Sequence, residues 1–244
     1  MGVETGRTGS QFRTTSWTLI ARAPHSRADM EALLARYSSP VYAYLCRKGY
    51  RSHDAEDLAQ AFLTEIVLGR DLVARADPAR GRFRSFLKRA LEHFVVDEHR
   101  RERGREGKRP VAHLMEDPAR RAAEPDAEDD PARAFDREWA TIILDEALRR
   151  VEAACRADGM HRQWAAFEAR VLRPIVHGCE PTPYPELLER LGAPTEQVVY
   201  TMVGTIKRKV NGELRELIAE TVDAPGEVQP ELEELMSCLA WGEG

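Results

Sequence analysis

Apolar residues recur at steps of three and four along most of this 244-residue chain, which is the spacing of amphipathic helices. The clearest run covers residues 28–48, where Pro40 predicts a kink or a break. Its apolar positions are Met30, Leu33, Leu34, Tyr37, Val41, Tyr44 and Leu45. Alternating β-branched runs are nearly absent, so the pattern predicts an all-α protein.

Start and stop residues delimit the other helices. Ser52 is typical of an N-cap for a helix over residues 53–68, and Gly69 follows its end. Thr182 and Gly192 bound a shorter helix in the same way. The remaining helices are expected at residues 16–22, 83–101, 135–157, 163–176 and from 196 onward.

The composition changes between residues 116 and 136, where eight acidic residues and three arginines stand among three prolines. Such a stretch is too charged and too rich in proline to bury a core, so it predicts a linker. The expected organisation is two small helical domains joined by this acidic linker. Its parts are an N-terminal segment (1–25), a first domain (26–110), the linker (111–136), a second domain (137–222) and an acidic C-terminal extension (223–244).

Charge is segregated along the chain. The whole sequence carries 36 Lys and Arg against 41 Asp and Glu, a net charge of −5. Residues 80–109, by contrast, hold eleven Lys and Arg against five Asp and Glu. A basic, aromatic-bearing helix in an acidic protein indicates contact with unstacked bases and phosphates, or with an acidic protein partner.

Catalytic, metal and membrane classes find little support. The pairs His53-Asp54 and His177-x-Cys179 lack further ligands at a suitable spacing, and there is no Gly-rich phosphate loop. The four cysteines form no C-x-x-C pair, which argues against a zinc ribbon and a disulfide framework. No membrane span or secretory signal is visible. We therefore expect a cytoplasmic protein that is not an enzyme and needs no cofactor or metal.

The second domain has the outline of a helix-turn-helix, because a short helix is followed by a glycine-containing turn and a longer helix. Base readout needs donors or acceptors near the start of the longer helix. The candidates for DNA contact are Thr195, Gln197, Tyr200, Thr201, Lys207, Arg208 and Lys209.

Two ordered motifs in the first domain resemble a known family. The stretch Asp54-Ala-Glu-Asp-Leu-x-Gln-x-Phe62 is similar to the segment of bacterial sigma factors that binds the β′ clamp helices of RNA polymerase. The later pattern Phe83-x-x-Phe86-Leu87, His93, Asp97, Arg100-Arg101 resembles the promoter-melting and −10-recognition segment of extracytoplasmic-function (group 4) sigma factors. The Arg80-Gly-Arg-Phe-Arg-Ser-Phe-Leu87 run is similar to a planctomycete-type branch of them.

The resemblance implies roles for particular residues. Those implied to bind polymerase are Asp54, Glu56, Asp57, Leu58, Gln60 and Phe62. Those implied to hold melted −10 DNA are Phe83, Arg84, Phe86, Lys88, Arg89, His93, Phe94, Asp97, Arg100 and Arg101. The second domain is expected to meet the −35 element or the polymerase β flap, and an anti-sigma regulator is a further expected partner. The second helix departs from the family, because Val199, Val203 and Gly204 stand where relatives often carry Arg or His.

Three functions remain open from the sequence. The first is a sigma factor that directs promoter-specific initiation. The second is a sigma-like regulatory protein that docks on polymerase or on an anti-sigma regulator without reading a −35 element. The third is an ordinary helix-turn-helix repressor, which leaves the first-domain motifs unexplained.

Overall fold

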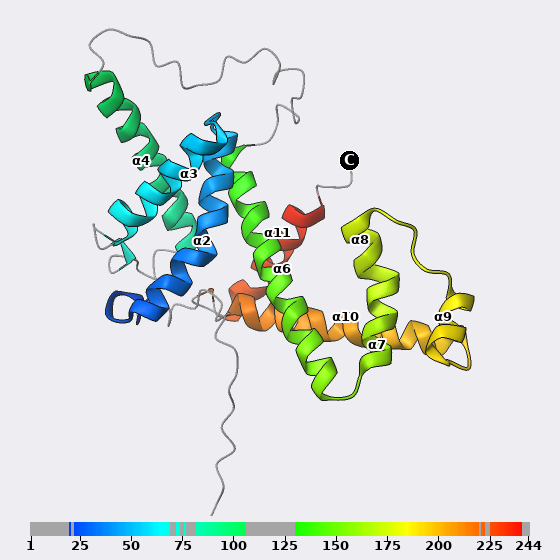
Figure 1. The fold of residues 1–244 in the computed structure, drawn as a ribbon. Coiled ribbons are helices and arrows are strands. Elements are labelled where there is room, and N and C mark those ends of the chain that lie inside the picture. The colour runs from blue at the N-terminus through cyan, green and yellow to red at the C-terminus, as the bar shows by residue number, and fades with distance from the viewer. Residues whose placement is uncertain are drawn as a thin grey trace, which may run out of the picture. The chain divides into compact units, whose positions relative to one another are not determined.

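The protein is helical throughout the part that the computed structural model describes (Figure 1). The described residues are 20, 22–68, 72–73, 76, 82–105, 130–219, 221–222 and 225–240, and no strand occurs among them. The all-α prediction is therefore confirmed. Most of the predicted helix at residues 16–22 and most of the predicted acidic linker lie outside these ranges, although residues 20 and 22 are helical.

The chain divides into two compact units, which are described separately. The first unit comprises residues 1–142 and 218–244, and the second comprises residues 143–217. Helix α6 (Pro131–Ala157) therefore contributes its first twelve residues to the first unit and the rest to the second. The acidic C-terminal extension groups with the first unit rather than standing as a separate segment after the second.

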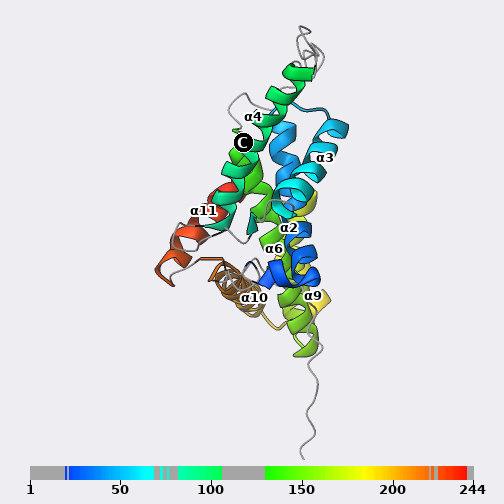
Figure 2. The same ribbon diagram turned by 90° about the vertical axis from the view of Figure 1, so that its left-hand side faces the viewer.

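The first unit is built from α2 (Arg27–Arg47), α3 (Ser52–Ala61), α4 (Phe83–Arg105), the start of α6, and α11 (Val228–Ala240). The short turns η1 (Ala23–His25) and η6 (Pro225–Glu227) precede α2 and α11, and the π-helical turn η2 (Phe62–Leu68) follows α3. Helices α2 and α3 pack together, and Figure 2 shows α11 beside the lower end of α4.

Helix α2 begins where Ser26 accepts a hydrogen bond from the backbone N–H of Asp29 at 3.3 Å, which is an N-cap. Pro40 lies inside this helix and is buried. The helix runs on to Arg47, so the alternative of a break at Pro40 is wrong. The buried positions of α2 follow the predicted three- and four-residue steps at Leu33, Tyr37 and Val41.

Aromatic rings join these helices in the core of the first unit. The ring of Tyr37 lies 5.5 Å from that of Phe83 and 6.1 Å from that of Phe135. Phe62 lies 5.5 Å from Phe94, which ties the turn after α3 to α4. Trp139 of α6 is also fully buried. Such pairs contribute beyond their buried area, so they fix α4 between its neighbours.

Two predicted caps are wrong. Helix α3 has Arg51 at its N-cap position with no side-chain cap, and Ser52 is instead hydrogen-bonded at 2.9 Å to the hydroxyl of Tyr42. Helix α9 (Tyr184–Leu191) has Pro183 at its N-cap, and it is the backbone of Thr182 that is engaged, through its carbonyl, by Arg170. Proline sets the extended backbone before a helix without any side-chain oxygen, so α9 starts correctly without the expected cap.

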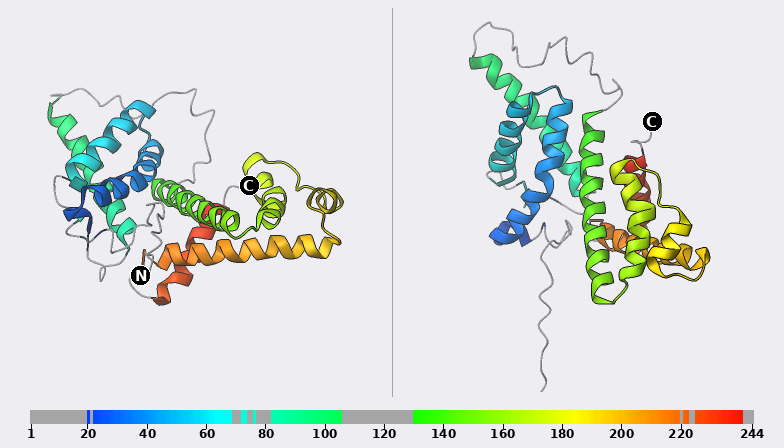
Figure 3. Two further views of the ribbon diagram at one scale, coloured as in Figure 1. Left: turned by 60° about the horizontal axis from the view of Figure 1, so that its bottom comes forward. Right: turned by 45° about the vertical axis from the view of Figure 1, so that its right-hand side comes forward.

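The second unit contains the end of α6, a helical segment made of α7 (His161–Phe167), η5 (Glu168–Leu172) and α8 (Arg173–His177), then α9 and most of α10 (Glu196–Ala219). Figure 3 shows α9 at the beginning of the long helix α10. Gly192 ends α9 in the left-handed region (φ 57°), as predicted. Arg162 donates to the carbonyl of Gly192 at 2.8 Å and holds the turn in place.

Candidate functional site

The outward face of α3 is acidic. Glu56, Asp57 and Gln60 are exposed, with the side chain of Asp57 68% exposed. Asp54 and Leu58 are partly exposed. Because Asp54 lies in the first turn, its carboxylate also suits the positive end of the helix dipole. Phe62 is different, since it is fully buried in the core and is not available at this surface.

A groove of about 530 Å³ lies between α2 and the segment formed by α3 and η2. Its walls are mostly apolar or weakly polar, and Glu56 and Gln60 line one side. The other lining residues are Leu34, Ala35, Ser38, Ser39, Tyr42, Ala59, Leu63 and Thr64. The acidic face of α3 therefore continues into a hollow that could receive an apolar side chain from a partner.

The middle of α4 exposes a second face. Arg89, His93, Val96 and Arg100 are exposed and recur at steps of three and four, so they form one stripe along the helix. Val96 is 43% exposed, so the stripe contains an apolar side chain between the cations. Val96 was not predicted as a surface residue of α4, although its place three residues after His93 puts both on the same face of a helix.

Two arginines at the far end of this stripe are paired with neighbouring carboxylates. Arg100 Nη1 lies 3.6 Å from Asp97 Oδ1, and Arg101 pairs with Glu98. Both arginines are largely exposed, and such surface pairs contribute little free energy. The two guanidinium groups can therefore exchange these carboxylates for phosphates at small cost.

The aromatic candidates for base stacking occupy the core instead. Phe83 and Phe94 are almost completely buried, and Phe86 is half-buried with its ring 6.3 Å from that of Phe83. The structure thus places Phe83 and Phe94 where they hold α4 in the fold. Further along the helix, the ring of His99 stacks on that of Tyr50 at 5.8 Å.

Two cations that the resemblance implies hold melted −10 DNA are already paired with carboxylates at the start of α4. Arg84 is 3% exposed, and its guanidinium contacts Asp136 at 2.9 Å, Glu231 at 3.0 Å and Glu234 at 2.8 Å. Lys88 Nζ lies 2.6 Å from Asp136 Oδ2. We call Arg82, Arg84 and Lys88, with their partners Asp136, Glu231 and Glu234, the α4–α11 ion cluster. Neither Arg84 nor Lys88 is presented to solvent as the sequence suggested.

Burial and charge act against each other in this cluster. Burial lowers the pKa of Arg84, but the three carboxylates raise it further, so the net direction is upward. Burial raises the pKa of Glu231 despite both arginines. In the less buried Glu234, burial also raises the pKa, but Arg84 and Arg82 outweigh it and the net direction is downward. Of these two glutamates, Glu231 is thus the one whose neutral form the fold favours.

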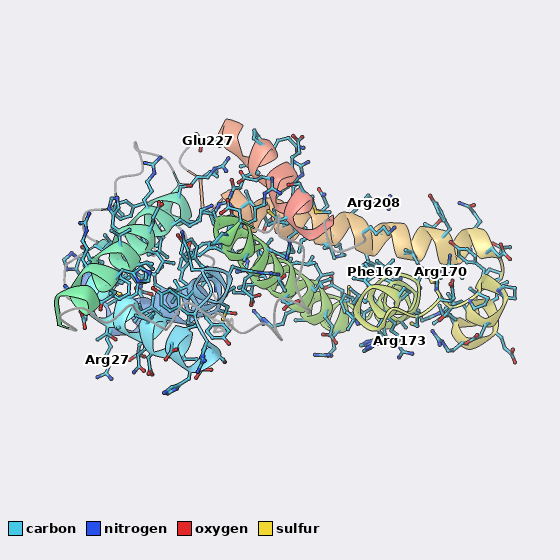
Figure 4. All side chains as sticks on the ribbon, turned by 90° about the horizontal axis from the view of Figure 1, so that it is seen from above. Arg27, Phe167, Arg170, Arg173, Arg208 and Glu227 are labelled. Carbon is cyan, nitrogen blue, oxygen red and sulfur yellow. The ribbon has the colours of Figure 1, made fainter. Side chains whose placement is uncertain are left out.

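In the second unit, the first half of α10 exposes Gln197, Tyr200 and Thr201, and Thr195 is exposed in the turn before it. Lys207 and Arg208 are exposed further along, and Lys209 lies 3.6 Å from Asp158. Figure 4 labels Arg208 on α10, and Phe167 and Arg170 on the preceding segment. These positions are compatible with DNA contact by α10, which stays a prediction.

The structure corrects one part of the helix-turn-helix interpretation. Val199 and Val203 are buried in the second unit, so they are core residues and not DNA-facing positions that have lost a polar side chain. Gly204 does face open space. The hydroxyl of Thr201 donates to the carbonyl of Gln197 at 2.8 Å, which leaves Gln197 and Tyr200 as the better placed groups for base edges.

Other chemistry is not apparent in the described ranges. They contain no group of three or more His, Cys, Asp or Glu arranged to hold a metal ion. They also contain no helix long and apolar enough to cross a membrane.

The first unit is thus a helical domain that exposes an acidic face on α3 and a basic stripe on α4. The family model described as Sigma-70 region 2 matches residues 33–105, which run from α2 to the end of α4. This match covers less than a third of the chain. It indicates binding of core RNA polymerase and promoter melting of the sigma-factor kind. No curated protein and no solved structure matches the chain.

Proposed function

We propose that this chain is a sigma factor that binds core RNA polymerase and directs promoter-specific initiation. The observation that carries the proposal is the Sigma-70 region 2 match, since it spans both the acidic face of α3 and the exposed stripe of α4. The motifs around Phe83 and Arg100 favour the extracytoplasmic-function group and its planctomycete-type branch. The chain would act in the cytoplasm, without enzymatic activity, under a regulator such as an anti-sigma protein.

Polymerase would dock on α3. Glu56 and Asp57 offer carboxylates to basic residues of the β′ clamp helices, and the groove beside them offers apolar surface. Asp57→Arg should reduce co-purification with core polymerase at least tenfold. Glu31→Arg is the matched control, because Glu31 is an exposed carboxylate on α2. Equal retention of both variants on polymerase would refute the docking face.

The melted −10 strand would lie along α4. Arg89, Arg100 and Arg101 supply exposed cations for phosphates, while His93 and Val96 supply a ring and an apolar edge against which a base can pack. Arg100→Ala should slow open-complex formation, measured by permanganate reactivity of promoter thymines. Arg27→Ala, which removes an exposed arginine of α2, should leave that reactivity unchanged. Identical footprints for the two variants would count against this path for the strand.

The second unit would contact the −35 element or the β flap through α10. Gln197 and Tyr200 are proposed as the base-reading side chains, with Lys207 and Arg208 on phosphates. Replacing Gln197 by Ala should relax the preference at one −35 base pair in a promoter library. An unchanged preference would favour a role for α10 on the polymerase flap.

Transcription from a defined promoter by purified polymerase distinguishes a sigma factor from a sigma-like regulatory protein that does not direct initiation. A sigma factor gives a discrete start site that depends on the added chain. A regulatory protein binds polymerase and gives no such start. A repressor binds duplex DNA tightly without polymerase.

A further inference from the structure

The α4–α11 ion cluster brings the acidic end of the chain to the basic start of α4 (Figure 2). No Lys or Arg follows Arg215, whereas eight Asp and Glu do. Two of these eight, Glu231 and Glu234, reach Arg82 and Arg84. Helix α11 is therefore held by opposite charge on the segment whose residue Arg84 the resemblance implies holds melted −10 DNA.

Helix α11 is held in the first unit by both apolar and ionic contacts. Leu232 and Leu235 of α11 are buried, so one side of the helix is anchored in the core. Glu231 on the same side is 1% exposed and lies 2.5 Å from Arg82 Nη1. Met236 and Glu233 are exposed. The helix thus covers the two arginines with carboxylates and turns its remaining charge to solvent.

The carboxylates of α11 stand in for phosphate oxygens in this arrangement. Guanidinium groups bind carboxylates and phosphates through the same planar donors. With α11 in place, the Arg82 side chain is 26% exposed and that of Arg84 is 3% exposed, and the guanidinium groups of both are engaged by carboxylates of α11. An anionic strand that follows α4 towards its start must compete with Glu231 and Glu234.

The seated state is also under-satisfied. Among the described residues, Arg84 Nε and Trp139 Nε1 are buried with no hydrogen-bond partner, although the Arg84 guanidinium stacks on the Trp139 ring at 4.7 Å. A buried polar network whose members are only partly satisfied is weaker than its number of ion pairs suggests. This favours a contact that a competing polyanion can open.

We propose that α11 is an autoinhibitory helix that occupies Arg82 and Arg84 and is displaced when nucleic acid extends along α4. The proposal rests on the proposed function, because it needs the α4 face to bind nucleic acid. With α11 seated, the free chain has only the far cations of α4 for the strand. With α11 released, Arg82 loses Glu231 and Glu234, and Arg84 keeps only Asp136 of its three carboxylates, so both can turn to phosphates.

The first test measures how a fluorescent single-stranded oligonucleotide binds to the full chain. Glu231→Gln/Glu234→Gln removes the two charges on the arginines and keeps the side-chain size. Glu227→Gln/Glu233→Gln is the matched control, because it makes the same change of net charge at two exposed positions of the same tail (Glu227 is labelled in Figure 4). We expect the first pair to bind at least tenfold more tightly than the control.

The salt dependence supplies a second readout. Each phosphate neutralised on a single strand adds roughly −0.7 to the slope of log K against log salt. Release of two arginines should steepen the slope by roughly 1.4 relative to the control pair. Equal affinity and equal slope for the two pairs would overturn the proposal.

Hydrogen exchange on the unmodified chain covers the case in which the Glu231 and Glu234 variant fails to fold. Saturating oligonucleotide should speed exchange of the amides of α11 at least tenfold and leave those of α9 unchanged. Binding with α11 still protected would show that the helix is a fixed part of the first unit and would refute its displacement. Polymerase co-purification distinguishes failure of the autoinhibition proposal from failure of the proposed function. If the chain joins polymerase but α11 stays protected when the oligonucleotide is bound, only the displacement of α11 is refuted. If the chain neither joins polymerase nor binds DNA, the proposed function is refuted.

Discussion

Replacing Arg84 by methionine tests the α4–α11 ion cluster directly as a source of stability. The guanidinium is 3% exposed and touches three carboxylates, of which Glu231 is the most buried. Methionine fills most of the volume but removes the charge. Removal of one partner from a buried ion pair typically costs about 3–5 kcal/mol, because the remaining charge stays buried.

The surviving cations place this case at the lower end of that range. Asp136 keeps Lys88 at 2.6 Å, and Glu231 keeps Arg82 at 2.5 Å. The loss of the cation–π contact with Trp139 adds about 0.5–2 kcal/mol. We therefore expect the free energy of unfolding of the first unit to fall by about 3.5–5 kcal/mol, summed from these two contributions.

Native-state hydrogen exchange is the appropriate assay, because two units need not unfold together and a single midpoint would mix them. A loss of about 3.5 kcal/mol, the lower end of this range, speeds exchange of the most protected amides of α4 roughly 300-fold. Amides of α9 in the second unit should not change. Arg27→Met, at an exposed ion pair of α2, is the control and should leave α4 protected.

An acceleration below about tenfold in α4, equal to about 1.4 kcal/mol, would refute the assigned role of Arg84. The double variant Arg84→Met/Glu231→Met sharpens the result. It removes the stranded carboxylate, so it should recover part of the loss. A double variant that is less stable than Arg84→Met alone would show that Glu231 is stabilised by groups other than Arg84.

Further predictions concern four positions. Phe94→Ala should lower the stability of the first unit by about 3–5 kcal/mol, measured by exchange in α4, because Phe94 is buried against Phe62. His93→Ala, at the exposed neighbouring position, should leave that stability unchanged while it weakens promoter opening. Gly204→Ala should stabilise the second unit by about 1 kcal/mol in urea unfolding, since an added methyl meets no atom. Burial raises the pKa of Tyr44 to about 12, so the fold favours its neutral form, and stability should fall as pH rises from about 10 to 12. Its tyrosinate absorbance should appear only towards the upper end of that window.

Much of the fold could be predicted from hydrophobic spacing alone, because local periodicity determines where a helix lies. Residues 28–48 were expected as a helix, and α2 runs from Arg27 to Arg47. The partners of the charged residues could not be predicted in this way. Arg84 meets Asp136 at a sequence separation of 52, and Arg82 meets Glu234 at a separation of 152. Charge composition gives no information on contacts at such distances.

The same limit explains the errors at the helix-turn-helix. Val199, Val203 and Gly204 were grouped by sequence position as one DNA-facing set. In the helix, Val199 and Val203 lie four residues apart on the buried side, whereas Gly204 is one position further round and faces open space. A face of a helix depends on which side the rest of the domain covers, and that side is known only once the other helices are placed.

The basic residues of α4 therefore fall into two groups, one paired internally and one exposed to solvent. At its start, Arg82, Arg84 and Lys88 are neutralised by carboxylates from α6 and α11. Further along, Arg89 and Arg100 face solvent. A net charge of −5 opposes tight binding of the free chain to DNA. The ion pairs with Glu231 and Glu234 also remove Arg82 and Arg84 from the cations available to DNA. In the proposed arrangement, one surface therefore binds nucleic acid weakly while α11 covers its start and more strongly once a strand has displaced α11.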